Sequence, residues 1–163
     1  MPDLSLTIRH ETAADTNAIE HLHERAFGPG RFARTASRLR ESGSQHAGSS
    51  YVAFVATMLV GSVRVTRIVV GDSPALMLGS LAVEPAFDGR GIGAALMNAS
   101  IKAAHSSGEK LIFLVGDEPY YKRFGFKRVP RGGPVMPGPV NPDRFLVLEL
   151  QDGAMQGITG ELR

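Results

Sequence analysis

Residues 85–96 read Pro-Ala-Phe-Asp-Gly-Arg-Gly-Ile-Gly-Ala-Ala-Leu, with glycines at alternate positions 89, 91 and 93. A β-rich run over 76–83 ends just before this stretch, and apolar residues at helical spacing follow it. Glycine permits positive φ and a close approach of a ligand to the backbone. The first N–H groups of a helix attract anions because they have no partner inside the helix. The stretch therefore predicts a turn that opens a helix of about 90–105 and binds a diphosphate or similar anion, with Arg90 adding positive charge.

Other interpretations of this turn remain open. A tight connection between a strand and a helix can contain glycines without binding any ligand. Gly89-x-Gly91-x-x-Ala94 also fits a looser form of the dinucleotide-binding fingerprint. That fingerprint normally opens a series of βαβ units, and the acidic residue expected about 20 residues later comes too late here, at Asp117 and Glu118. A Walker phosphate loop is excluded because no Gly-Lys-Ser/Thr follows the turn.

The segments before the turn predict a short strand, two helices and a β-meander. Residues 4–9 alternate apolar and polar, and Thr12 and Asp15 have the spacing of a capping box for a helix that ends at Gly28. A second helix is expected over 32–41. Three β-rich runs then lie close together in the sequence, at 51–56, 60–70 and 76–83. Connections this short join antiparallel neighbours, because a parallel crossover needs a dozen or more residues.

The segments after the turn complete a single mixed α+β domain over residues 1–163. The apolar run 111–115 predicts a buried strand that lies parallel to the strand before the turn. A short helix over 118–124, a proline-rich loop over 130–142 and a last strand over 145–150 follow. The anion-binding part of the domain spans 79–105 and the C-terminal part spans 110–150. We expect about seven strands, mostly antiparallel, flanked by about four helices.

A second motif suggests a family. Residues 120–126 read Tyr-Tyr-Lys-Arg-Phe-Gly-Phe. Together with 85–96, this stretch resembles the two signatures of the GNAT superfamily of N-acetyltransferases: Gln/Arg-x-x-Gly-x-Gly/Ala between a strand and a helix, and aromatic-Tyr-x-x-x-Gly-Phe after the next strand. The lead-in Val-Gly-Asp at 115–117 is similar to one branch of small bacterial acetyltransferases. The resemblance covers nearly the whole chain and implies the GNAT-like acyl-CoA N-acyltransferase fold, whose central sheet is splayed in the middle.

The resemblance also implies acetyl-CoA as co-substrate and no metal. The pantetheine arm would bond to the strand backbone, and the diphosphate would lie on the N–H groups of the glycine turn. Tyr121 would protonate the departing CoA thiolate after an amine attacks the thioester directly. The residues implied in cofactor binding are Leu81, Ala82, Val83, Asp88, Gly89, Arg90, Gly91, Ile92, Gly93, Ala94, Tyr121 and Lys122. Asp88 departs from the family's Gln or Arg, and its carboxylate either opposes the diphosphate, turns outward or caps the helix.

The acceptor side is less well defined by the sequence. Glu84 ends the strand before the turn, so we expect it to act as general base, directly or through water; a solvated strand end fits the same position. Ser80 and Asp117 are weaker candidates, and no histidine is expected nearby. Basic residues form two groups that fit either binding roles or solvated faces. Those expected near an anionic acceptor are Arg31, Arg34, Arg38 and Arg40, and those expected near the CoA 3′-phosphate are Lys122, Arg123, Lys127, Arg128 and Arg131.

Composition excludes several classes of function. The chain has no Cys, which rules out disulfides, thiolate metal sites and a Cys nucleophile, and its five His are scattered. A net charge of +2 over 163 residues does not argue for nucleic acid. The sequence shows neither a signal peptide nor an apolar run that could span a bilayer, so we expect a cytoplasmic monomer or homodimer with no membrane partner.

Three functions are therefore compared. The leading one is transfer of an acetyl group from acetyl-CoA to an unidentified amine of a small molecule or protein. The second is a non-catalytic acyl-CoA-binding module, which Asp88 and the unassigned base keep open. The third is a nucleotide-dependent enzyme of another fold.

Overall fold

A computed structural model describes residues 5–27 and 44–163 of the chain. Its central sheet has the order β1-β3-β4-β5-β6-β9-β7, and the short β2 pairs with β4 beside this path. The strands of this sheet are β1 (Leu6–His10), β2 (Ser44–Gln45), β3 (Tyr51–Val55), β4 (Met58–Val70), β5 (Ser73–Val83), β6 (Leu111–Val115), β7 (Lys127–Arg128) and β9 (Phe145–Glu149). The β1 to β5 pairings are all antiparallel, so the predicted meander is confirmed.

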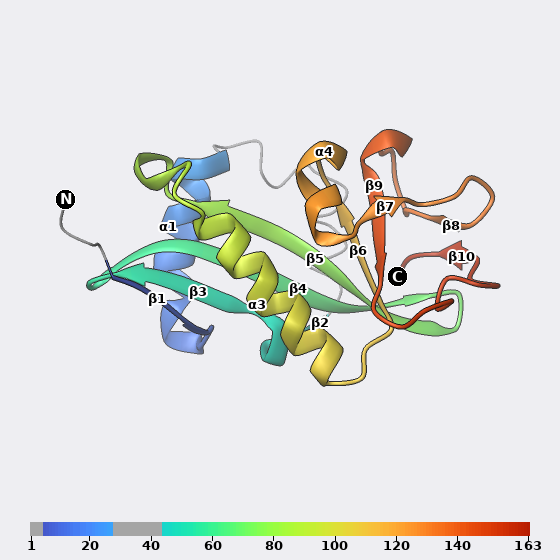
Figure 1. Cartoon of the computed structure of the whole chain (residues 1–163), viewed down its shortest axis with the longest axis horizontal. Coiled ribbons are helices and arrows are strands. Elements are labelled where there is room, and N and C mark those ends of the chain that lie inside the picture. The colour runs from blue at the N-terminus through green and yellow to red at the C-terminus, as the bar shows by residue number, and fades with distance from the viewer. Residues whose placement is uncertain (1–4, 28–43) are drawn as a thin grey trace.

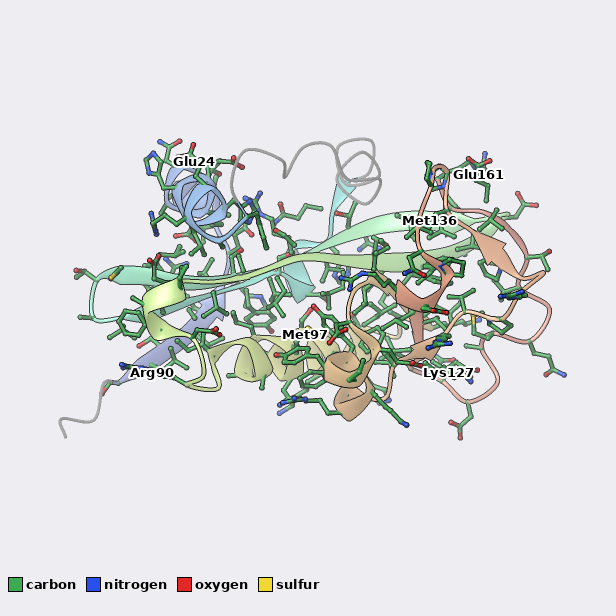
Figure 2. The ribbon with its side chains drawn as sticks, turned by 90° about the horizontal axis from the view of Figure 1, so that it is seen from above. Glu24, Arg90, Met97, Lys127, Met136 and Glu161 are labelled. Carbon is green, nitrogen blue, oxygen red and sulfur yellow. The ribbon has the colours of Figure 1, made fainter. Side chains whose placement is uncertain are left out.

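Two long helices cover opposite faces of the sheet. They are α1 (Thr16–Phe27) and α3 (Ile92–Ser106), and a short α4 (Glu118–Tyr121) follows β6. Figure 2 shows α1, which carries the labelled Glu24, on one side of the sheet and α3, which starts near Arg90, on the other. The predicted helix over 32–41 and its basic residues Arg31, Arg34, Arg38 and Arg40 lie outside the described residues. None of the described helices is long and apolar enough to cross a membrane.

The start of α1 follows the predicted capping box, with one difference. A 3-10 turn (Ala13–Asp15) comes between Thr12 and the helix proper. The Thr12 N–H donates to Asp15 Oδ2 at 2.8 Å, and Arg9 donates two further bonds of 2.8 Å to the same carboxylate. These bonds, led by those from Arg9, lower the pKa of Asp15 to about 2. The charged carboxylate therefore ties the edge strand β1 to the beginning of α1.

β5 divides its side chains between the two helices. Ala82 packs with Ile19 and Leu22 of α1. Leu81 and Val83 pack in the core cluster that contains Ile92 and Leu96 of α3. Because successive side chains of a strand point to opposite faces, even-numbered residues at this end of β5 face α1 and odd-numbered residues face α3.

The sheet opens between β5 and β6, as the resemblance implied. These parallel strands pair only at Leu76 with Ile112 and at Met77 with Phe113, although β5 continues to Val83. Figure 1 shows the two strands diverging: β6 runs up to α4, whereas β5 continues toward α1. In its pairing with β4, β5 also contains an extra residue between Leu78 and Leu81. A bulge of this kind bends a strand, which favours the separation from β6.

The C-terminal part is more regular than the sequence indicates. The predicted helix over 118–124 is α4 followed by a 3-10 turn (Lys122–Phe124), and the proline-rich loop contains β8 (Pro134–Val135). β8 pairs in parallel with β10 (Gly160–Glu161) of the tail. The tail is held further by Leu162, which is fully buried.

Candidate cofactor and acceptor sites

The glycine turn has the backbone geometry that the sequence predicts. Gly91 is the N-cap of α3 with φ 77° and ψ 9°, and Gly89 has φ 76°. Only glycine adopts this left-handed region without strain. A Cβ added at Gly89 or Gly91 would meet nothing within 4 Å, so the turn is open on this side. The open side and the N–H groups of the first turn of α3 together can receive an anion.

Asp88 and Arg90 both interact with the turn itself. Asp88 Oδ1 accepts the N–H of Gly89 at 3.0 Å, and α3 has no side-chain cap. The Asp88 carboxylate therefore occupies the Gly89 N–H, one of the donors that a bound anion would use. The guanidinium of Arg90 lies over the ring of Phe87, 5.1 Å from the centroid. The charge of Arg90 is therefore held close to the turn.

Tyr121 lies where β6 ends. Its ring packs against Gly116, since a Cβ at that glycine would come within 2.9 Å of Tyr121 Cδ2. Burial, with a smaller contribution from neighbouring Tyr120, raises the pKa of Tyr121 to about 12. The phenol therefore remains a hydrogen-bond donor throughout the physiological pH range.

Tyr120 reaches the glycine turn, which sequence reasoning did not predict. A Cβ at Gly93 would lie 2.9 Å from the Tyr120 hydroxyl, so this phenol touches the first turn of α3. Burial raises the pKa of Tyr120, and the Arg123 guanidinium, 4.5 Å above its ring, opposes that shift. Any side chain at position 93 would clash with the Tyr120 hydroxyl, so this position requires glycine. The only sequence signal was the pair of adjacent tyrosines, and its two members point to different places.

Most of the basic cluster after Tyr121 is committed to other partners. Lys127 pairs with Glu149 at 2.9 Å, and Arg128 pairs with Glu118 at 3.0 Å and with Asp143 at 3.2 Å. Lys122 and Arg131 are exposed. Among the described residues, neither Lys122 nor Arg131 forms an ion pair, which leaves both charges available to a phosphate.

Glu84 is buried at the end of β5, so the interpretation as a solvated strand end is wrong. Only 8% of the residue is exposed, and Arg25 Nε of α1 donates to its Oε2 at 2.6 Å. Asp117, the weaker candidate, is the exposed residue before α4, and its carbonyl accepts the N–H groups of Tyr120 and Tyr121 at 3.1 Å. Its observed role is therefore structural.

A histidine does lie beside the acceptor candidates, so the expectation that none would is wrong. His23 Nε2 of α1 lies 2.8 Å from Ser80 Oγ of β5, and both residues are buried. The periodicity of α1 contained the signal: Ile19, Leu22 and Ala26 form the apolar face, and His23 lies four residues after Ile19 on that face. Among the described residues, no three of His, Asp or Glu are grouped so that they could hold a metal ion.

Known proteins with similar sequences place this arrangement in a family. Residues 46–128, about half of the chain, match the model of the Acetyltransferase (GNAT) domain. The chain belongs to the GNAT family. An uncharacterized N-acetyltransferase of Escherichia coli, YjhQ, is 30% identical over 131 residues, which cover 75% of this chain and 72% of that protein. The GNAT chain is thus an N-acetyltransferase, and the hypothesis of a nucleotide-dependent enzyme of another fold is wrong.

Solved structures support the same fold. The GNAT family N-acetyltransferase YhbS from Escherichia coli, in complex with CoA, is 26% identical with a TM-score of 0.85, and the match covers 99% of this chain and 91% of that one. A GNAT family acetyltransferase from Brucella melitensis, in complex with acetyl-CoA, is 24% identical with a TM-score of 0.75, covering 98% and 96%. The predicted GNAT-like fold is therefore confirmed for this chain.

Proposed function

We propose that this GNAT protein transfers the acetyl group of acetyl-CoA to an amine of a small molecule or protein by direct attack. The observation that carries the proposal is the open glycine turn of α3 beside the end of β5, where β5 has separated from β6. Similar proteins have been solved with CoA and with acetyl-CoA, which supports acetyl-CoA as the co-substrate here. We further propose a cytoplasmic monomer or homodimer that acts without a nucleic-acid or membrane partner.

The pantetheine arm would bond to β5 as an additional strand does. Leu81, Ala82 and Val83 pair with β4 along one edge. On the other edge, β6 no longer pairs with them. Backbone groups directed toward that edge can bond the two amides of pantetheine, because a separated strand presents unpaired donors and acceptors.

The diphosphate would lie on the N–H groups of the glycine turn. The residues proposed for it are Gly89, Arg90, Gly91, Ile92, Gly93 and Ala94, with Asp88 and Lys122 at the margin. Asp88 must release the Gly89 N–H when the anion binds, since both accept from the same donor. Like charges 4 Å apart in water repel by about 1 kcal/mol, so Asp88 weakens binding modestly unless its side chain turns away.

The reacting atoms would meet between the ends of β5 and β6. The acceptor amine must be neutral to attack, yet most amines are protonated at pH 7. We propose that Glu84 assists removal of the amine proton, directly or through water. Tyr121, whose raised pKa keeps it protonated, would donate a hydrogen bond to the CoA thiolate and share its proton as the C–S bond breaks.

A non-catalytic acyl-CoA-binding module is the second candidate. Two observations favour it: Asp88 occupies a donor of the anion turn, and Arg25 occupies the Glu84 carboxylate. Both functions predict that acetyl-CoA and CoA, but not NAD or ATP, raise the melting temperature. Release of CoA thiol separates them, measured with free lysine, spermidine and a lysine-containing peptide with a free α-amino group. Turnover with any of these amines supports the transferase; stabilisation by acetyl-CoA without turnover supports the binding module.

A further inference from the structure

We infer that Ser80 and His23 form the route by which the proton of the acceptor amine leaves the reaction site. This inference rests on the proposed acetyl transfer and offers an alternative to Glu84 as the group that takes the amine proton. Ser80 would touch the amine, and His23 would receive the proton through the Ser80 hydroxyl.

The pair has the geometry of a hydroxyl and its base. Ser80 Oγ and His23 Nε2 are 2.8 Å apart, and the two residues come from β5 and α1, 57 positions apart in the chain. Ser80 is 8% exposed and His23 is 9% exposed, so little water competes for the bond between them. A hydroxyl can accept one proton while it donates another, which makes serine suited to a relay.

The position of the pair matches the acceptor side of the proposed site. Ser80 precedes the segment 81–83 that would bind pantetheine, and it lies beyond the last residue pair between β5 and β6. Its side chain faces α1, as Ala82 and Glu84 do, whereas Leu81 and Val83 face α3. With the cofactor's diphosphate at the start of α3, we place the acceptor amine on the α1 side of β5, beside the Ser80 hydroxyl.

The proton step balances without any further reagent. The amine nitrogen attacks the thioester carbon, and the C–S bond breaks with its electron pair on sulfur. The surplus amine proton passes to Ser80 Oγ while the Ser80 proton passes to His23 Nε2. This direction requires His23 to carry its other proton on Nδ1 before the reaction. Tyr121 donates a hydrogen bond to the thiolate, which takes up a proton from solvent, and the imidazolium releases its proton to solvent.

Both acidic and basic side chains occur on α1 and on the segments that pack against it. α1 carries Glu20, Glu24 and Arg25, and the segments packed against it carry Asp15 in the 3-10 turn, Arg64 in β4 and Glu84 just after β5. Arg25 pairs with Glu84 at 2.6 Å, and Arg64 lies 4.0 Å from Glu20. The ring of Phe27 packs 5.5 Å from the imidazole. The part of the pH profile that His23 causes is therefore identified by comparing wild type with a His23 variant.

The test compares His23→Gln with His21→Gln, an exposed residue of the same helix. Gln can still hydrogen-bond to Ser80, but it cannot take a proton. With acetyl-CoA and the amine of the panel that wild type uses fastest, we expect His23→Gln to lower kcat/KM about 100-fold. The part of the rise of kcat/KM with pH that depends on His23 should disappear as well. His21→Gln should keep the wild-type profile, and acetyl-CoA should stabilise all three proteins equally.

A second pair of variants covers the case in which His23→Gln fails to fold. Ser80→Ala removes the hydroxyl, and Ser62→Ala removes another buried hydroxyl on β4, opposite Ala82. The relay predicts a large loss of kcat/KM in Ser80→Ala and none in Ser62→Ala. If His23→Gln folds, the Ser80→Ala/His23→Gln double variant should show no additional loss.

Three results would overturn the inference. Wild-type rates and pH profile in His23→Gln or Ser80→Ala would remove the relay while leaving the acetyl transfer intact. An acetyl group found on Ser80 by mass spectrometry, after incubation with acetyl-CoA alone, would replace the relay by a covalent intermediate. A wild-type protein that releases no CoA with any amine of the panel would reject the proposed function itself.

Discussion

Replacing Gly91 by Val tests the anion turn against a control at the other end of the same helix. Gly91 precedes α3 with φ 77°, and Gly108 follows it with φ 82°; a Cβ at either would meet nothing within 4 Å. A side chain in this left-handed region costs about 1–2 kcal/mol. For a chain of this size the melting temperature falls by about 2–4 °C per kcal/mol, so Gly91→Val and Gly108→Val should each lose about 2–8 °C.

Only one of the two variants should lose its response to acetyl-CoA. A ligand at about 100 times its Kd stabilises the native state by about 2.7 kcal/mol, which corresponds to about 5–11 °C here. We expect this shift in wild type and in Gly108→Val. In Gly91→Val the side chain enters the open space of the turn and turns the N–H groups of Ile92 and Gly93 away from the anion, so the shift should vanish.

The assay is thermal unfolding of the three proteins with and without acetyl-CoA at one fixed concentration. Comparing each protein with its own ligand-free melting temperature removes the common effect of backbone strain. An equal shift in Gly91→Val and Gly108→Val would refute the reasoning, because the turn would then not bind the cofactor.

Three further predictions concern single residues. Tyr121→Phe should lower kcat about 100-fold and leave the acetyl-CoA thermal shift unchanged, with Tyr51→Phe as control; an unchanged kcat where chemistry limits the rate would remove Tyr121 from the mechanism. For Glu84→Gln, kcat/KM should still rise with pH to a plateau, but that plateau should lie about tenfold lower; an unaltered profile would leave the proton step to water and other residues. The lowered pKa of Asp15 means that its charged form stabilises the fold above about pH 4 and that this contribution is lost as the pH falls toward 2. Urea unfolding between pH 6 and 2 should therefore show less acid sensitivity in Asp15→Asn than in wild type, and parallel curves would contradict this.

The features that could be predicted from the sequence are those that a contiguous stretch of residues determines. The long helix was expected over about 90–105 and is observed at Ile92–Ser106. The meander follows from short connections, and the glycine turn follows from the spacing of three residues beside that helix. Each of these signals depends on local backbone preference and on side-chain periodicity, which a short stretch of sequence contains in full.

The acceptor side could not be predicted because its contacts join distant parts of the chain. Arg25 and Glu84 are 59 positions apart, and His23 and Ser80 are 57 apart. These pairs depend on how α1 lies across the sheet, and no local pattern determines that placement. The tyrosine pair shows the same limit at short range, since only packing decides that Tyr120 reaches Gly93 while Tyr121 packs against Gly116.

The extra residue in β5 determines the face of the sheet on which the Ser80 side chain lies. Val65 pairs with Leu78, and strict alternation from there would set Ser80 opposite Val63, on the α3 face with the other side chains of that cluster. Instead Val63 pairs with Leu81, because β5 uses three steps where β4 uses two. Leu81 therefore takes the α3 face, and Ser80 turns to α1 and to His23. One inserted residue thus bends the strand away from β6 and also moves a hydroxyl from the α3 face to the α1 face. For this reason, a sequence prediction that assumes strict alternation of side chains along β5 assigns Ser80 to the wrong face of the sheet.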